Sequence, residues 1–310
     1  MSDPVPAASE SDGTPWRRAA ARIDAYERLL RLDKPIGTLL LLWPTLSALW
    51  LASAGRPRWL LVIIFSVGTL LMRSAGCAVN DWADRHFDRH VERTARRPLA
   101  TGEIAPWEAL VLAAALCACA FLLILATNRV AVMWSIPAVL ITVAYPFFKR
   151  FFVLPQAFLG IAFSFGIPMA YAAALGHLPA FAWSLVLINL FWVVAYDTEY
   201  AMVDRDDDVR IGIHTSALLF GRHDVLAVGI CYVVYLLGMA WVGHATGLGL
   251  PYFIALGMAA VIAGVHMRWI RGRDRTQCFR AFLHNHWLGL AIFAGIVLDY
   301  GLRRNAWPVL

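Results

Sequence analysis

The chain has 310 residues, of which 60% are hydrophobic and only 15% are charged, and its mean hydropathy is +0.62. Because a soluble domain carries about 25% charged residues, this composition excludes a soluble protein with one anchor and indicates many membrane crossings. The formal net charge of +6 follows from membrane topology and requires no nucleic-acid partner.

The first 34 residues differ in composition from the rest of the chain. Residues 1–15 are rich in Ser, Pro and Ala and lack an apolar core, so we expect a disordered tail and not a signal peptide. Residues 16–34, WRRAAARIDAYERLLRLDK, place Arg among Leu, Ile and Tyr at helical spacing, which predicts an amphipathic helix on the membrane surface. A mitochondrial targeting role is the alternative, and the acidic residues here count against it. Residues 35–305 are predicted to form a single transmembrane domain.

Windows of about 20 apolar residues predict an all-α polytopic membrane protein with nine transmembrane helices. Their approximate ranges are 36–54, 59–79, 107–127, 130–148, 153–175, 181–196, 225–243, 251–269 and 287–302. The shorter windows at 181–196 and 287–302 are expected to extend into their polar flanks.

The distribution of Lys and Arg tests this arrangement. Of the 27 Lys and Arg residues, 21 fall in segments on one side of the predicted membrane, five fall on the other side, and Arg73 lies within a span. Basic residues gather on the cytoplasmic side of membrane proteins, so this asymmetry predicts a cytoplasmic N-terminus.

Two acidic clusters follow spans that leave the membrane on this same side. NDWADRHFDRHVERTARRPLATGEI, residues 80–104, follows the second span, and YDTEYAMVDRDDDVRIGIHTS, residues 196–216, follows the sixth. Because the clusters lie four spans apart in the same orientation, they hint at a parallel repeat of four plus four spans with a ninth added.

Helix geometry sorts the carboxylates of these clusters. At 100° per residue, two sets of three fall on narrow stripes if each helix continues beyond the membrane: Asp81, Asp84 and Asp88, and Asp197, Asp204 and Asp208. Glu199 and Asp206 point the opposite way and are expected to be solvated or paired with nearby Arg. Stacked carboxylates are unfavourable without a cation, so two such faces directed at one cavity predict an oxygen-ligated divalent cation, with Mg²⁺ the natural candidate.

Basic side chains beside the stripes would bind the diphosphate oxygens of a substrate, and the candidates are Arg93, Lys149 and Arg150. Charged loops beside membrane helices are usually just solvated, and this simpler interpretation is kept for Glu92, Arg96, Asp206 and Asp207. Zinc is an alternative metal, because His86 and His90 have the i, i+4 spacing of zinc helices. No Glu follows His86, however, and both His side chains point away from the carboxylate stripe.

Arg73 lies within the second span, about two turns before Asp81. An Arg inside the membrane is costly and usually faces a polar cavity or pairs with an anion. We therefore expect Arg73 to have either a buried structural partner or a substrate carboxylate as its partner.

The two motifs resemble those of the UbiA-type intramembrane prenyltransferases. The first, N-D-x-x-D-x-x-x-D, is formed by Asn80, Asp81, Asp84 and Asp88, and the second, D-x-x-Y-A-x-x-D-x-x-x-D, by Asp197, Tyr200, Ala201, Asp204 and Asp208. Residues 31–50, 72–104, 145–173 and 195–221 resemble the members that act on 4-hydroxybenzoate in ubiquinone biosynthesis, and the likeness covers about residues 28–300. One departure is His214, where the family pattern has Lys.

The resemblance implies nine helices around a central cavity, Mg²⁺ bound by the six aspartates, and polyprenyl diphosphate whose tail leaves toward the membrane lipids. It implies that diphosphate departs to give an allylic carbocation, that the ring carbon ortho to the phenol attacks, and that a proton is lost. Arg73 matches a position near the aromatic acid. Arg93, Tyr145, Lys149 and Tyr196 match positions near the diphosphate, and Asn80 and Arg150 are further candidates for substrate binding.

Other functions stay open at this stage. Homogentisate or a haem precursor is the alternative acceptor, and a transporter is the main alternative from a different class, because intramembrane charge and repeats also occur there. A lipid-binding scaffold is a third alternative, but it does not explain two stripes of carboxylates suited to binding a metal. We expect a multi-pass protein of a bacterial inner membrane with its active site facing the cytoplasm, and the mitochondrial inner membrane is the alternative.

Overall fold

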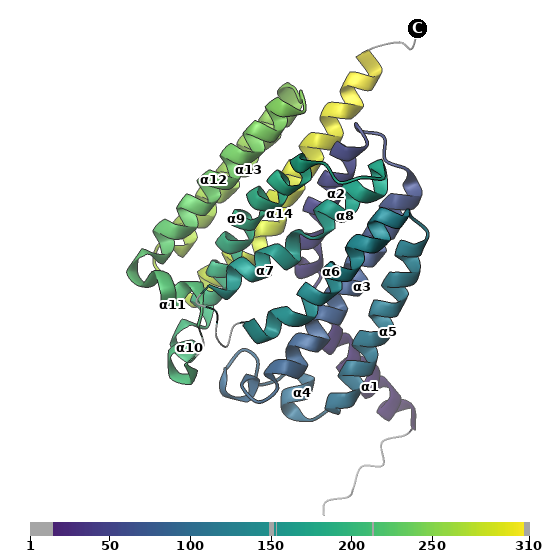
Figure 1. Cartoon of the computed structure of the whole chain (residues 1–310). Coiled ribbons are helices and arrows are strands. Elements are labelled where there is room, and N and C mark those ends of the chain that lie inside the picture. Colours follow the sequence, from purple (N-terminus) through teal and green to yellow (C-terminus); the bar gives the residue numbers. More distant parts are fainter. Residues whose placement is uncertain (1–14, 149–151, 153, 213, 307–310) are drawn as a thin grey trace, which may run out of the picture.

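The computed structural model describes residues 15–306 except 149–151, 153 and 213. Residues 1–14 of the predicted tail and the candidates Lys149 and Arg150 therefore lie outside the described residues, while Pro15 already belongs to a helix. Every regular element within these ranges is helical (Figure 1). The elements are α1 (Pro15–Leu30), α2 (Ile36–Ala52), α3 (Trp59–Asp84), η1 (Asp88–His90), α4 (Pro98–Thr101), α5 (Pro106–Leu125), α6 (Arg129–Phe148), α7 (Pro155–Ser164), α8 (Gly166–Leu175), α9 (Ala180–Val203), α10 (Arg205–Ile211), α11 (Ser216–Phe220), η2 (Gly221–His223), α12 (Asp224–Ala245), α13 (Leu250–Ile270) and α14 (Arg275–Ala306).

Eight helical segments of the described chain are long and apolar enough to cross a membrane. The predicted span at 153–175 is one of them, although it bends between α7 and α8. The predicted extensions of 181–196 and 287–302 are confirmed, because α9 and α14 both run well past the apolar windows. The remaining predicted span corresponds to α2, an apolar helix of only 17 residues that contains Pro44, so the count of nine stays a prediction.

The bend between α7 and α8 lets two helices approach closely. A Cβ built on Gly166 would lie 2.1 Å from Oγ1 of Thr45 in α2. Because only glycine leaves room for this contact, the first turn of α8 packs directly on α2.

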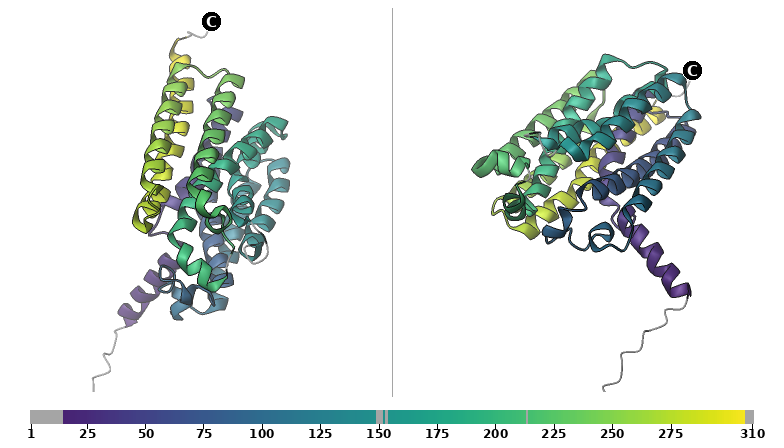
Figure 2. Two further views of the ribbon diagram at one scale, coloured as in Figure 1. Left: turned by 90° about the vertical axis from the view of Figure 1, so that its left-hand side faces the viewer. Right: turned by 60° about the horizontal axis from the view of Figure 1, so that its bottom comes forward.

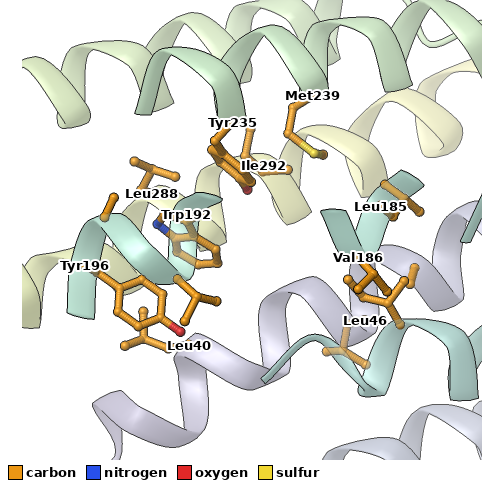
Figure 3. Packing of buried hydrophobic residues seen from close by; sticks show 14 of the residues in the cluster. Leu40, Leu46, Leu185, Val186, Trp192, Tyr196, Tyr235, Met239, Leu288 and Ile292 are labelled. Atoms are coloured by element: carbon orange, nitrogen blue, oxygen red, sulfur yellow. The ribbon is translucent and has the colours of Figure 1, made fainter. Parts of the chain in front are cut away.

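The core lies where α2, α9, α12 and α14 meet. Trp192 and Tyr196 of α9 are fully buried there, with Tyr235 of α12 stacked on Trp192 (Figure 3). Leu288 and Ile292 of α14 close the cluster. Large apolar side chains are instead exposed along α5, α6, α12 and α13, as expected for helices that face lipid.

The short elements α1, α4 and α10 gather at one end of the bundle, and the end of α14 lies at the other (Figure 1). From this first end α1 projects away from the long helices (Figure 2). Its Ala25 and Leu29 are buried in a small cluster with Leu99 and Ile104. The helix is therefore anchored at the end of the bundle that carries both acidic motifs, and its contact with the membrane surface stays a prediction.

Candidate active site

A cavity of about 1240 Å³ extends from this end into the bundle. Its polar part is lined by residues that the sequence singled out, namely Arg73, Asn80, Asp81, Tyr145, Tyr196 and Asp197. Its apolar part includes Phe121 of α5 and Ile136 and Leu140 of α6, whose side chains are exposed. The cavity thus joins a charged region to an open apolar groove, which suits a ligand with a polar head and a long apolar tail.

The first motif lies at the C-terminal end of α3. The side chains of Asp81, Asp84 and Asp88 are buried, whereas His86 and His90 are exposed, as the helical angles predict. The assumption that the helix continues through Asp88 is wrong. The chain turns after Asp84, where the Phe87 amide donates to the Asp84 carbonyl at 2.8 Å, and Asp88 begins the 3₁₀ helix η1.

Two arginines neutralise this buried acidic group. Arg31 donates from Nη2 to both oxygens of Asp81, at 3.0 and 2.8 Å. Arg97 places Nη1 between Asp81 and Asp88, at 2.8 and 2.9 Å from their oxygens. Burial raises the pKa of Asp88 above its ordinary value, while the positive charge of Arg97 opposes that rise. The turn after Asp84 is explained by this bridge, because it returns Asp88 to the guanidinium that Asp81 already contacts.

The second motif is also divided between two helices, so its assumed continuous helix is wrong as well. Helix α9 ends at Val203, and Asp204 caps it while its carbonyl accepts the amides of Asp207 and Asp208, each at 2.9 Å. Asp197 lines the cavity, and Asp208 is buried in α10. The residues at this break have different partners, because Asp204 pairs with Arg93 while the next residue, Arg205, pairs with buried Asp224 at 2.8 Å.

Arg93, which follows the first motif in the chain, contacts the second motif. Its Nε lies 3.0 Å from each oxygen of Asp204 and its Nη2 2.5 Å from one of them. The same guanidinium lies over the ring of Tyr200, 4.3 Å from the centroid, and donates to its hydroxyl. This contact spans 111 positions of sequence. Of the six aspartates of the two motifs, Asp81 and Asp197 line the same cavity.

Glu199 does not lie in solvent or beside an Arg, so that expectation is wrong. Its carboxylate is fully buried on the side of α9 away from the cavity, where it accepts hydrogen bonds from Tyr232 and Asn285, both at 2.8 Å. Tyr232 also contacts His266 at 3.0 Å. The expectation is confirmed for Asp206, which is exposed near Arg275.

Arg73 faces the polar cavity, which is one of the two environments predicted for it. Its Nη1 donates to the sulfur of Cys77, and its Cζ lies 6.0 Å from the ring centroid of Phe163. Its buried Nε has no hydrogen-bond partner among the described residues, and the same holds for the buried hydroxyl of Tyr196. Two unsatisfied donors thus lie at the wall of the cavity, where an anionic ligand would satisfy them.

The donor atoms of the site fit magnesium. Carboxylate oxygens are its preferred protein ligands, and Mg²⁺ usually binds one or two carboxylates together with waters and substrate phosphates. No three His, Cys, Asp or Glu side chains of the described chain are arranged as a complete cage. Carboxylates beside a cavity for an anionic ligand are donors that suit Mg²⁺ when substrate phosphates and waters complete its coordination.

Comparison with known proteins decides the family. The model of the UbiA prenyltransferase family matches residues 41–289. The chain belongs to the UbiA prenyltransferase family. The 4-hydroxybenzoate octaprenyltransferase of Dechloromonas aromatica (strain RCB) is 58% identical over 294 residues, covering 94% of this chain and 99% of that protein. The enzyme of the same name from Ralstonia nicotianae is 59% identical over 283 residues, covering 91% and 97%.

Solved structures agree with the UbiA-family fold. A UbiA homolog from Aeropyrum pernix K1 superposes with a TM-score of 0.74 at 26% identity and covers 84% of this chain and 97% of its own. A UbiA homolog from Archaeoglobus fulgidus, described as bound to GPP and Mg²⁺, superposes with a TM-score of 0.68 at 16% identity, covering 88% of this chain and 99% of its own. The second likeness concerns the fold alone.

In this UbiA-family chain, sequence reasoning missed the contacts of Arg31 and Arg97. The sequence marks both only as charges on the predicted cytoplasmic side, and no spacing rule connects Arg31 to a carboxylate 50 residues later. The position of Arg31 at the end of an amphipathic helix, just before the first apolar span, was the one available signal. His214, the departure from the family pattern, is exposed and does not line the cavity.

Proposed function

We propose that this chain transfers a polyprenyl group from polyprenyl diphosphate to the ring carbon ortho to the hydroxyl (C3) of 4-hydroxybenzoate, releasing diphosphate, in ubiquinone biosynthesis. The observation that carries the proposal is the cavity, which connects two acidic motifs and Arg73 to an open apolar groove. Relatives that are 58–59% identical over almost the whole chain, and that are named 4-hydroxybenzoate octaprenyltransferases, support this substrate pair.

The cavity residues divide between the two substrates. Bound Mg²⁺, held by Asp81, Asp84, Asp88, Asp197, Asp204 and Asp208, would neutralise the leaving diphosphate. Asn80, Arg93, Tyr145, Lys149, Arg150 and Tyr196 bind the diphosphate from the protein side. Arg73 binds the carboxylate of 4-hydroxybenzoate and thereby orients its ring.

The chemistry is electrophilic aromatic substitution. Loss of diphosphate leaves an allylic cation, and the apolar groove keeps water away from it. Aromatic side chains such as Phe163 stabilise the cation with their ring faces. The ring carbon ortho to the phenol attacks, and a carboxylate of the motifs accepts the proton that is released.

The proposal includes an arrangement of the chain in the membrane. The chain crosses a bacterial inner membrane nine times, with α2 as the shortest span, the N-terminus in the cytoplasm and residues 16–34 on the membrane surface. Support comes from the 21 basic residues on the predicted inner side and from the clustering of α1, α4 and α10 at the end of the bundle that holds both motifs. The active site then faces the cytoplasm, from which 4-hydroxybenzoate arrives.

The test is prenyl transfer by membranes that contain the protein, with 4-hydroxybenzoate and octaprenyl diphosphate first and other chain lengths after. We expect prenylated product and diphosphate in equal amounts, and loss of both when a chelator removes Mg²⁺. Product formation from homogentisate alone would move the chain to another acceptor within the family. Uptake of substrate without diphosphate release would contradict the enzyme and favour a transporter.

A further inference from the structure

The guanidinium of Arg73 lies directly against the backbone of Gly37, the second residue of α2. A Cβ built on Gly37 would lie 3.0 Å from Cζ of Arg73 and only 2.6 Å from both its Nε and its Nη2, and the 2.6 Å contacts are closer than real Cβ atoms approach other atoms. The present position of Arg73 therefore requires a residue without a side chain at 37.

Two further contacts hold the guanidinium of Arg73 in this position. One turn along α3, the sulfur of Cys77 accepts from Nη1, and from α7 the ring of Phe163 faces the guanidinium at 6.0 Å. Gly37, Cys77 and Phe163 thus surround the charged group from three helices. The buried Nε keeps one donor without a partner among the described residues, and Gly37 and Arg73 both line the cavity.

We propose that Gly37 is a positioning residue for the acceptor, because its bare backbone fixes the orientation in which Arg73 receives the acceptor's carboxylate. The inference rests on the proposed function in one respect, namely that Arg73 binds the carboxylate of an aromatic acid. A guanidinium binds a carboxylate through two parallel hydrogen bonds, so its tilt decides the direction in which the ring points. A shift of about 1 Å at this point misaligns the ring carbon with the prenyl cation.

Substitution of Gly37 by Ala tests this without threatening the fold. The three atoms nearest to the added methyl all belong to the end of the Arg73 side chain, which can move without displacing backbone. Alanine also forms helix more readily than glycine, by about 1 kcal/mol in a helix interior. The variant Gly37→Ala is therefore expected to fold with a displaced guanidinium.

Michaelis constants for both substrates give the first readout. For Gly37→Ala we expect KM for 4-hydroxybenzoate to rise about tenfold, and KM for octaprenyl diphosphate to stay within about twofold, because misplacing a positioning group costs binding of the group it positions. The matched control is Gly264→Ala in α13, where a Cβ meets nothing within 4 Å and the cavity is not involved. An unchanged KM for 4-hydroxybenzoate, or an equal rise for both substrates, would overturn the proposal.

Alkylation of Cys77 gives a second readout that needs no turnover. Cys77 is buried beneath Arg73, so moving the guanidinium should raise its labelling by maleimide several-fold, measured on the Cys77 peptide by mass spectrometry. If Gly37→Ala is labelled faster but the unmodified protein does not prenylate 4-hydroxybenzoate, the contact between Gly37 and Arg73 is supported and the proposed function is rejected. If the unmodified protein prenylates 4-hydroxybenzoate but Gly37→Ala changes neither the labelling nor the KM, the proposed function is supported and the role of Gly37 is rejected.

A double substitution separates the contact with Arg73 from a general effect of the methyl group. Lysine has no planar guanidinium to meet the added methyl, so Gly37→Ala should change KM for 4-hydroxybenzoate by less than about twofold when Arg73→Lys is already present. A tenfold effect that persists in the lysine background would show that Gly37 acts by another route and would refute the inference.

Discussion

At the residue scale, carboxylates of both motifs form ion pairs with arginines that lie outside the motifs. Asp81 binds Arg31 and Arg97, and Asp204 binds Arg93. Asn has the size of Asp but carries no charge, so it cannot balance either the arginines or a divalent cation. We expect Asp81→Asn and Asp204→Asn each to lower prenyl transfer by about 100-fold or more, since losing even a supporting group of a metal site costs 10- to 100-fold.

The control for these two variants lies within the second motif itself. The carboxylate of Asp206 is 76% exposed, so Asp206→Asn makes the same chemical change without touching the cavity. It should keep wild-type rates, and all three variants should be present in membranes in equal amounts. Near wild-type transfer by Asp81→Asn or Asp204→Asn would reject the assignment of these carboxylates to the reaction.

At the element scale, a buried polar cluster connects α9 to the helices behind it. Glu199 accepts from Tyr232 of α12 and Asn285 of α14, and Asn285 accepts from Trp192 of α9 at 2.9 Å. Glu199→Leu removes the acceptor for two buried donors, which should cost about 2 kcal/mol of unfolding free energy, visible as a lower melting temperature in detergent. Glu199→Gln keeps a carbonyl for Tyr232 and should lose less than half as much. Equal losses would show that these hydrogen bonds do not hold the helices together.

Helices were predictable from the sequence, but their ends and partners were not. Lipid selects continuous apolar runs of a fixed length, so the positions of α3, α5 and α9 follow from composition alone. Beside the turns at Asp84 and Asp204 lie ion pairs made by Arg97, Arg93 and Arg205, and these ion pairs join segments that no helical period connects. The burial of Glu199 was missed for the same reason, because its partners lie on α12 and α14.

At the scale of the whole molecule, the two ends of the bundle differ in their charged residues and in the elements that they carry. The end with α1, α4 and α10 carries both acidic motifs and the mouth of the cavity, and α14 finishes at the opposite end (Figure 1). An odd number of crossings places the two chain ends on opposite sides of the membrane, and an even number places them on the same side. The 17-residue helix α2 therefore decides the topology, because it is the segment whose crossing separates nine spans from eight.

Reporter fusions test this topology directly. With nine crossings and a cytoplasmic N-terminus, alkaline phosphatase fused after α14 should be active, because that enzyme matures only outside the cytoplasm, and a fusion in the loop after α3 should be inactive. Inserting two Arg residues in the middle of α2 should block its crossing, since each costs about 2.5–3.5 kcal/mol at the centre of a membrane helix. The matched insertion in the loop between α2 and α3 should change nothing. An inactive fusion after α14 in the unmodified chain would reject either the ninth crossing or the cytoplasmic N-terminus. The side of the membrane on which an epitope tag placed before α2 is accessible tells which of the two fails.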